Sequence, residues 1–399
     1  QYLQGQLSPA KWFREAALHE AMQWLGRGYT PARRTWYDFR DRADKFIHLI
    51  HAQIMQQAAV EARFDPTIAA LDGTTIAACA SRHRVVNQPT LEQRTTVLTQ
   101  VIAGEPVDPV PRWVPPTDSG RNDLARRMQQ ATQVLADRIA RNAKKPSGKR
   151  QDPQKIYVSL SDPTAALGRD KCKVYRPLYT VQMMVAPQSH WILAYRCDAA
   201  ATDAGTLAPM IDQTQALVEN RLRTVLADAA YCSIVDLQEC QSRGVELLSP
   251  VQAHAFTVDK SSAGSAQRIT REQFRWNTTE QNYECPQGHS LNYVARSRVR
   301  RHSDHVLWES RYRCDPQHCG ACPLAARCLR PGAASRTIKR LEGQEHLEAQ
   351  RAKMNTPEAQ ERYRLRSQTV ELVFADSKGN RGFETFHGRG LARVRAETG

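Results

Sequence analysis

The chain has 399 residues, of which 41% are hydrophobic, and its 56 Lys and Arg outnumber 41 Asp and Glu to give a formal net charge of +15. This composition excludes disordered, collagen-like and coiled-coil chains, and the length allows one large core or two to three ordinary ones. The apolar stretches, such as residues 46–55, fall far short of the roughly 20 residues that span a bilayer, and the excess positive charge favours nucleic acid as the partner over a mere solubility charge.

The N-terminal region is predicted to be helical. The chain begins at Gln1 rather than Met, without a signal or transit sequence, so we expect a fragment of a cytoplasmic protein that lacks its natural start. Residues 8–28 predict one helix, with Ser8 as cap and Pro9 in the first turn. Residues 30–62 predict a helical stripe, with room for one break, that packs in the core through apolar side chains at spacings of three and four: Trp36, Phe39, Ala43, Phe46, Ile50 and Ile54.

The middle of the chain mixes strands and helices. Residues 67–80 predict a strand, a turn at Asp72 and Gly73, and a second strand, whereas residues 81–155 are polar and Pro-rich with one helix at about 119–142. Strands are then expected at 157–162, 178–186, 190–200, 223–231 and 245–251, with helices from Thr206 to about Asn220 and at 235–244. Asp203 is expected to cap the first of these helices. The alternation indicates a mixed α/β sheet.

Residues 250–340 have a different character, with short antiparallel strands expected at 256–260, 274–286, 289–301 and 305–314. Five of the ten cysteines fall in this segment. Cys319 and Cys322 form a CxxC pair, Cys328 follows closely, and Cys285 lies upstream, a pattern that favours one structural Zn²⁺ over a disulfide set or free thiols. Cys314 or His289 could replace Cys285 as the fourth ligand. The scattered cysteines earlier in the chain are interpreted as small core residues.

Three carboxylates stand at places where an unpaired charge would be costly. Asp72 and Asp228 end apolar strands, and Glu371 lies on a helix among apolar neighbours. Oxygen ligands of this kind could hold divalent metal, and Lys378, two helical turns after Glu371, could contact a phosphate. The chain contains no GxSxG, GxxxxGK[ST] or HExxH motif, so serine hydrolases, P-loop NTPases and zincins lack their signal.

The order of these motifs resembles the RNase H-like DDE transposases of bacterial insertion sequences. The similarity is carried by LDGTTIAACAS at 71–81, SDPTAA at 161–166, LADAAY at 226–231, CPQGHSL at 285–291, CGACPLAARC at 319–328 and the long segment at 363–391. The resemblance covers nearly the whole chain. It implies an α/β fold with an RNase H-like mixed sheet flanked by helices, interrupted by a small β-rich zinc-binding subdomain and preceded by a helical N-terminal region.

The resemblance also implies a mechanism and a set of site residues. Asp72, Asp228 and Glu371 would be the catalytic triad and would hold two Mg²⁺ or Mn²⁺ ions, and Tyr363, Arg366 and Lys378 would belong to the signature around the last acid. The reaction would be cleavage at transposon ends followed by attack of the 3′-OH on target DNA, both in-line phosphoryl transfers. The implied partner is double-stranded DNA, bound by a homodimer in the nucleoid.

Other residues of the site carry open alternatives. Asp162 either caps a turn or supports the active site. Arg296, Arg298, Arg300 and Arg301 alternate as in a strand and either contact DNA or form a solvated edge. Thr75 stands where the family commonly has Lys, Ala230 replaces a Gly, and Arg366 lies one residue further from Glu371 than in the related signature. The alternatives to a transposase are a zinc-containing nucleic-acid-binding protein and an RNase H-like nuclease without strand transfer, including a decayed copy.

These expectations divide the chain into four parts. Residues 1–64 form a helical, DNA-binding N-terminal region and residues 65–249 the first part of the catalytic core. Residues 250–342 form the β-rich insert with the zinc-binding cysteines. Residues 343–399 complete the core with the last catalytic acid and a basic tail.

Overall fold

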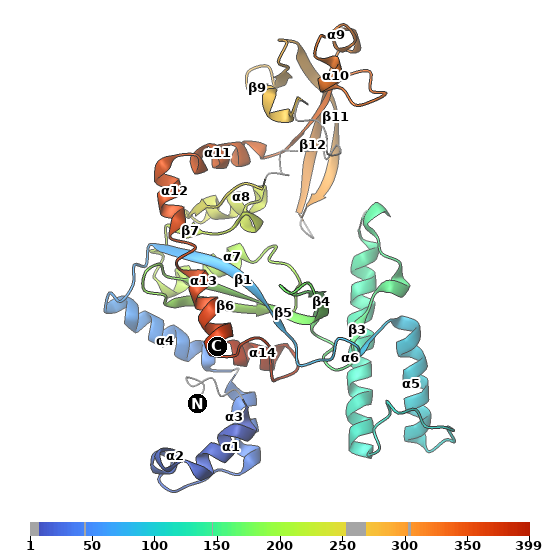
Figure 1. The fold of residues 1–399 in the computed structure, drawn as a ribbon, viewed down its shortest axis with the longest axis vertical. Coiled ribbons are helices and arrows are strands. Elements are labelled where there is room, and N and C mark those ends of the chain that lie inside the picture. The colour runs from blue at the N-terminus through green and yellow to red at the C-terminus, as the bar shows by residue number, and fades with distance from the viewer. Residues whose placement is uncertain (1–7, 44, 146, 253–268, 302–304) are drawn as a thin grey trace.

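The computed structural model describes residues 8–399 apart from 44, 146, 253–268 and 302–304, so the strand expected at 256–260 lies outside the described residues. Two sheets and a long helical hairpin dominate this part of the chain (Figure 1). Among the described residues, no helix combines the length and the apolar character that a bilayer crossing requires.

The N-terminal region consists of four short helices: α1 (Pro9–Leu18), α2 (Glu20–Leu25), α3 (Arg33–Ala43) and α4 (Ile47–Val60). The single helix expected at 8–28 is therefore two, which meet at His19 with its extended backbone. The expected core stripe was also wrong in part, because Phe39, Ile50 and Ile54 are 47%, 43% and 50% exposed. Instead, α4 joins the core through Met55, Ala58 and Ala59.

The larger sheet has six strands and a mixed topology. It comprises β1 (Ile68–Ala77), β4 (Ala166–Arg169), β5 (Tyr175–Val185), β6 (Ile192–Asp198), β7 (Thr224–Leu226) and β8 (Glu246–Leu248). β5 runs antiparallel to β1, β4 and β6, whereas β7 is parallel to both β1 and β8. The helices α7 (Leu207–Leu217) and α8 (Ile234–Ser242) connect these strands, and the result is a mixed α/β sheet compatible with the expected fold class.

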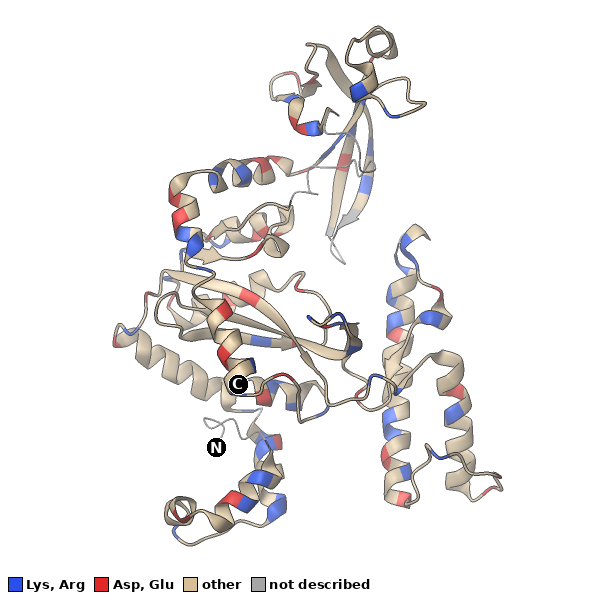
Figure 2. Cartoon of the chain, viewed as in Figure 1, with Lys and Arg blue, Asp and Glu red and all other residues tan. Residues whose placement is uncertain are grey.

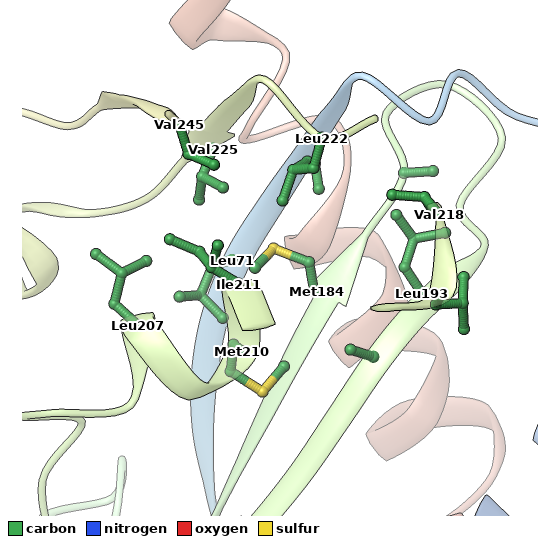
Figure 3. Close-up of a cluster of buried hydrophobic side chains, with 14 of the residues drawn as sticks. Leu71, Met184, Leu193, Leu207, Met210, Ile211, Val218, Leu222, Val225 and Val245 are labelled. Carbon is green, nitrogen blue, oxygen red and sulfur yellow. The ribbon is translucent and has the colours of Figure 1, made fainter. Parts of the chain in front are cut away.

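Each face of this sheet carries its own apolar core. One cluster joins the sheet to α4, α7 and α8 and includes Leu71, Met184, Met210 and Val225 (Figure 3). The other cluster joins the opposite face to the C-terminal helices and includes Ile76, Val181, Val370 and Phe374. Successive strand residues face opposite sides, so Leu71 belongs to the first core and Ala70 and Ile76 to the second. Asp72 therefore faces the C-terminal helices.

A helical hairpin is inserted between β2 (Val85–Val86) and β3 (Val158–Ser159), which pair with each other. It contains α5 (Gln88–Ala103) and α6 (Asp118–Ala143), with a core of its own around Leu91, Leu98 and Met128. The sequence indicated α6 but not α5. In α5 the buried residues are Leu91 and Leu98, and such a sparse apolar pattern among Thr and Gln residues gives a weak periodic signal.

The second sheet lies within residues 275–341, in the order β13–β12–β11–β10–β9. Its strands are β9 (Arg275–Asn277), β10 (Asn282–Glu284), β11 (Ser290–Arg301), β12 (His305–Cys314) and β13 (Thr337–Leu341), with the short helices α9 (Pro316–Gly320) and α10 (Ala325–Cys328). Short 3-10 turns occur at Ser147–Lys149, Pro153–Lys155, Ala229–Tyr231 and Arg271–Gln273. The expected β-rich segment is thus present.

The C-terminal part is helical and returns to the first sheet. It comprises α11 (Gln344–Met354), α12 (Pro357–Arg364), α13 (Val370–Ala375), a π-helical turn (Asp376–Asn380) and α14 (Leu391–Thr398). Figure 1 shows α13 crossing the sheet beside β1, although some 300 residues separate them in the chain. This return brings the last part of the sequence to the strand that carries Asp72.

Candidate active site

Asp72 lies within a continuous strand rather than at the expected turn. β1 runs without a break from Ile68 to Ala77, and Asp72 pairs with Met183 of β5. The predicted strand–turn–strand was therefore wrong. Asp-Gly favours turns when both flanking segments are free, but here all of Ala70–Ala77 pair with β5. The side chain of Asp72 is 17% exposed, and its Oδ1 accepts a hydrogen bond of 2.8 Å from the backbone N–H of Gly73.

Asp228 lies next to Asp72 because of the register of two parallel strands. Ala70 of β1 pairs with Leu226, the last residue of β7, and two more residues along each chain lead to Asp72 and Asp228. The Asp228 carboxylate accepts a 2.8 Å hydrogen bond from the Ala230 N–H and so caps the 3-10 turn Ala229–Tyr231. Its backbone carbonyl accepts a 2.6 Å hydrogen bond from Ser249 Oγ. The carboxylate and the backbone carbonyl of Asp228 are thus both held by hydrogen bonds.

Glu371 approaches from α13, and Arg366 lies between it and Asp72. Arg366 Nη2 is 3.2 Å from Asp72 Oδ2, and Nη1 is 3.7 Å from Glu371 Oε1. The Arg366 side chain is 14% exposed, whereas that of Glu371 is 60% exposed. The Nε of Arg366 is buried and has no hydrogen-bond partner in the described part of the chain. Arg366 therefore acts as the counter-charge of this group of acids.

Tyr363 and Lys378 flank the same place. Tyr363 is half-buried and hydrogen-bonded to Arg366, and burial raises the pKa of its hydroxyl. Lys378 donates to Thr74 Oγ1 at 2.7 Å and to the Thr75 carbonyl at 3.3 Å. Burial lowers the pKa of Lys378, and Lys171 nearby adds to this effect. Tyr363, Arg366 and Lys378 thus gather beside β1, next to the two aspartates.

A residue that sequence reasoning missed as part of the site, Asp203, lies against Gly73, the neighbour of Asp72 in β1. The expected cap of α7 is not formed by its side chain, because Asp203 Oδ1 instead accepts a 2.5 Å hydrogen bond from Gln182 Nε2. Gln182 Oε1 in turn accepts from the hydroxyl of Tyr231, which is 2% exposed. The missing side chain of Gly73 leaves room for this network, since a Cβ there would lie 2.5 Å from Asp203 Oδ1.

The electrostatics show an excess of negative charge at this place. Burial raises the pKa of Asp72, while Arg366 and the Gly73 N–H oppose the rise and Asp228 adds to it. Burial likewise raises the pKa of Asp203, with a further contribution from Asp228. The hydroxyl of Tyr231 has its pKa raised by burial and by all three aspartates.

The described residues contain no group of three or more His, Cys, Asp or Glu arranged to hold a metal ion. Asp72 and Glu371 both contact Arg366, but the Glu371 side chain is 60% exposed. The chemistry of the donor set still fits a hard cation. Asp72 is partly buried, burial raises its pKa, and the nearby charge of Asp228 adds to the rise against the opposing effect of Arg366, so a bound cation would stabilise the ionised carboxylates.

Asp162 lies away from this group. Its side chain is buried and accepts hydrogen bonds from Thr164 Oγ1 at 2.9 Å, from the Tyr179 hydroxyl at 2.8 Å and from the Gly390 N–H at 3.2 Å. These contacts tie β5 to the loop before α14. Of the two readings of Asp162, the geometry favours a structural one.

The five clustered cysteines line one small cavity in the second sheet, together with His289 and His318, whose rings stack at 4.3 Å. Cys285 follows β10, Cys314 ends β12, and Cys319, Cys322 and Cys328 lie in or beside α9 and α10. Backbone N–H groups of Gln287 and Leu324 donate to the sulfurs of Cys285 and Cys322. Burial, with Cys319 beside it, raises the pKa of Cys314 to about 12. As placed, these thiols do not form a metal site.

The arginines of β11 contact an aromatic ring. The guanidinium groups of Arg296 and Arg298 lie 4.4 Å and 5.0 Å from the ring centroid of Trp308, and Arg296 also lies 3.2 Å from Glu342. Arg300 and Arg301 are part of the strand, but their side chains lie outside the described residues. Among the described side chains, Arg296 and Arg298 contact Trp308 rather than the acids of the first sheet.

Comparison with known proteins gives one match. Residues 284–399 match the family described as transposase DDE domain. The matched segment contains Glu371, Arg366 and Lys378, but it begins after the part of the chain that carries Asp72 and Asp228. The chain matches no curated protein and no solved structure.

Proposed function

We propose that the chain is a DDE-type transposase, which cuts DNA at transposon ends and joins the 3′-OH to target DNA at Asp72, Asp228 and Glu371; the match of residues 284–399 to the transposase DDE domain supports this. The observation that carries the proposal is the parallel register of β1 and β7, which sets Asp72 beside Asp228. Arg366 then links Asp72 to Glu371, which comes from the matched family segment. Asp72 is thus connected to both other acids, to Asp228 through the strand register and to Glu371 through Arg366.

The proposed chemistry needs divalent metal, which Mg²⁺ or Mn²⁺ would supply by activating the attacking oxygen and stabilising the leaving oxygen. Asp72 and Asp228 would provide fixed ligands because each carboxylate is already oriented by a backbone N–H. Glu371 is exposed and would complete the site by turning inward on α13. Arg366, freed from Asp72, would then be available to a DNA phosphate, and its unpartnered Nε offers a further donor.

The test replaces each acid by its neutral amide. We expect Asp72→Asn, Asp228→Asn and Glu371→Gln each to abolish Mg²⁺-dependent cleavage of a DNA that carries the transposon ends, while DNA binding stays close to wild type. Asp38→Asn, an exposed aspartate on α3, is the matched control. Cleavage that survives all three changes would refute the assignment. Cleavage without joining of the 3′-OH to a second DNA would instead support the nuclease alternative.

The proposal extends to the cysteine cavity, where we propose one structural Zn²⁺ held by Cys285, Cys319, Cys322 and Cys328, with Cys314 or His289 as substitutes. The support is the donor chemistry: five thiols and two imidazoles line one cavity. Zinc binds thiolate, and a cation would reverse the effect of burial on the thiol pKa values. Metal analysis should find about one zinc per chain in the wild type and a loss in Cys322→Ser. The exposed Cys172→Ser is the control. A folded wild-type chain without zinc would contradict the site.

Further parts of the proposal concern organisation. We propose that residues 1–64 bind DNA, that residues 65–249 and 343–399 form the catalytic core, and that residues 250–342 form the insert. We also propose a homodimer on double-stranded DNA, acting in the cytoplasm at the nucleoid. The net charge of +15 supports a polyanionic partner.

A further inference from the structure

A cleft lined by four arginines lies at the far end of β1. Arg82 and Arg84 follow the strand, Arg176 comes from β5, and Arg389 precedes α14. The remaining lining residues are small or polar, and no carboxylate lies among them. Arg176 is paired with Asp170 at 3.0 Å, and Arg389 Nε donates to the Cys79 carbonyl at 3.0 Å, which fixes both guanidinium groups.

A fifth arginine reaches the same place from the helical hairpin. Arg127 lies on α6, and its pKa is lowered first by burial and then by the charges of Arg389 and Arg84, while Asp123, one helical turn earlier, opposes the shift. Like charges brought together in this way repel each other, and folding tolerates them where an anion can compensate the charge. Figure 2 shows both positive and negative residues along α6, the helix that carries Arg127.

The cleft is joined to the acids by one continuous segment. Lys378 contacts Thr74, the backbone of Ala77 is hydrogen-bonded to Glu384 and Phe386, and Arg389 contacts Cys79. Residues 378–389 therefore follow β1 from the acidic site to the cleft. At about 3.3 Å per strand residue, Ala77 lies about 17 Å from Asp72, which matches roughly five base pairs of duplex DNA.

From this geometry we infer that the cleft binds the phosphate backbone of the DNA whose reacting phosphate lies at Asp72, a surface that rests on the proposed function and extends it. The planar guanidinium fork suits phosphate oxygens, and several such groups in a cleft whose lining contains no carboxylate favour a polyanion over an acidic patch of a folded protein. The contact would be independent of base sequence, because phosphate contacts position a duplex and do not read it.

The test measures binding of the full chain to a fluorescent 30-bp duplex at several salt concentrations. Each phosphate contact contributes about 0.9 to the slope of log K against log salt, so Arg84→Gln/Arg127→Gln should lower that slope by about 2 and weaken binding at low salt. The matched control is Arg126→Gln/Arg141→Gln, which removes the same charge from exposed positions of α6 outside the cleft. Its slope should stay within experimental error of the wild type.

The variant Arg84→Lys/Arg127→Lys keeps the positive charges and so distinguishes a loss of charge from a loss of folding. We expect it to recover most of the wild-type slope of log K against log salt. Equal slopes in the Gln pair and its control would overturn the inference. So would a slope loss in the Gln pair that the Lys pair, folded by circular dichroism, does not recover. Failure of the proposed function can be distinguished from failure of this inference. It would appear as DNA cleavage by Asp72→Asn, independently of the salt dependence of DNA binding by the cleft variants.

Discussion

The behaviour of Asp72 depends on a balance between burial and one arginine. Burial favours the neutral carboxyl and raises its pKa, while Arg366 at 3.2 Å favours the charged form. A carboxyl that binds metal has to be deprotonated, so any further rise of this pKa moves the loss of metal binding to higher pH. Arg366 is thus expected to set the acid limit of activity.

We therefore expect Arg366→Gln to shift the acid limb of Mg²⁺-dependent cleavage to higher pH. The charge that lowers the pKa of Asp72 is lost, whereas burial and Asp228 continue to raise it. The pH profile of kcat/KM measures this, and Arg366→Lys should restore much of the wild-type limb. A profile of unchanged shape with a lower plateau would mean that Arg366 acts on substrate alone.

A substitution at Asp203 can remove the negative charge of this residue while keeping its hydrogen bond. Asn at this site can still accept the hydrogen bond from Gln182 but removes a negative charge beside Asp228. We expect Asp203→Asn to weaken the apparent Mn²⁺ affinity about fivefold to tenfold, the equivalent of about 1–1.4 kcal/mol of charge–charge interaction. Mn²⁺ titration followed by calorimetry or electron paramagnetic resonance measures the effect, with Asp38→Asn as control.

The same variant has an opposite effect on stability. A carboxyl whose pKa is raised by folding destabilises the fold when it is ionised, and this cost is absent below the unfolded-state pKa of about 3.9. Metal-free Asp203→Asn should therefore be more stable than wild type at pH 7.5, and the gain should vanish near pH 3.5. Urea unfolding at the two pH values measures it. A loss of stability at pH 7.5 would show that the hydrogen bond, not the charge, dominates at Asp203.

At the scale of elements, the site depends on β1 being a single strand that other groups approach closely. Gly73 is the position where this matters, since a Cβ there would lie within 2.8 Å of both Asp203 and Gln182. Real Cβ contacts are longer than this, so a side chain would displace the network between β1, β5 and Tyr231. The glycine is therefore required for space and not for a turn.

We expect Gly73→Ala to lower the free energy of unfolding by about 1–3 kcal/mol and to reduce cleavage, because overpacking forces neighbouring groups to move. Gly148→Ala, which meets nothing within 4 Å, should be neutral or slightly stabilising. Denaturant unfolding of both variants provides the comparison. Equal free energies of unfolding for the two variants would show that the strand can accept a side chain at Gly73 without loss of stability.

Part of this architecture could be predicted from the sequence, and the exceptions have physical reasons. The strands around Val181 and Val225 are apolar and were predicted, as was the helix that carries Leu135. The turn expected at Gly73 was wrong because tertiary pairing with β5 overrides the local preference of Asp-Gly. The stripe through Phe39 and Ile50 was wrong because periodicity gives one face of a helix but not what covers it.

Site residues were predictable to a different degree. The convergence of Glu371 with Asp72 followed from a family resemblance, because no local pattern relates residues some 300 positions apart. Asp203 was missed because its role depends on a register, Gly73 opposite Gln182, that only the folded sheet defines. The position of Arg366 between two acids was likewise beyond any spacing rule.

On the scale of the whole molecule, a small acidic site lies within a strongly basic chain. The candidate acids lie beside one stretch of β1, while four arginines line the cleft at its far end. Such a distribution suits a reaction in which metal neutralises the acids and the surrounding cations hold a long polyanion. The account stands on the claim that Asp72, Asp228 and Glu371 surround the same metal.

Localised cleavage of the protein by bound iron tests that claim most directly. Fe²⁺ in place of Mg²⁺, with ascorbate and peroxide, generates hydroxyl radicals that cut the backbone next to the ion, and mass spectrometry identifies the cut sites. We expect cuts in the wild-type chain near Asp72, Asp228 and Glu371, all suppressed by excess Mg²⁺ and absent in Asp72→Asn. Cuts that leave out any of the three segments, or that persist in Asp72→Asn, would contradict a shared metal site.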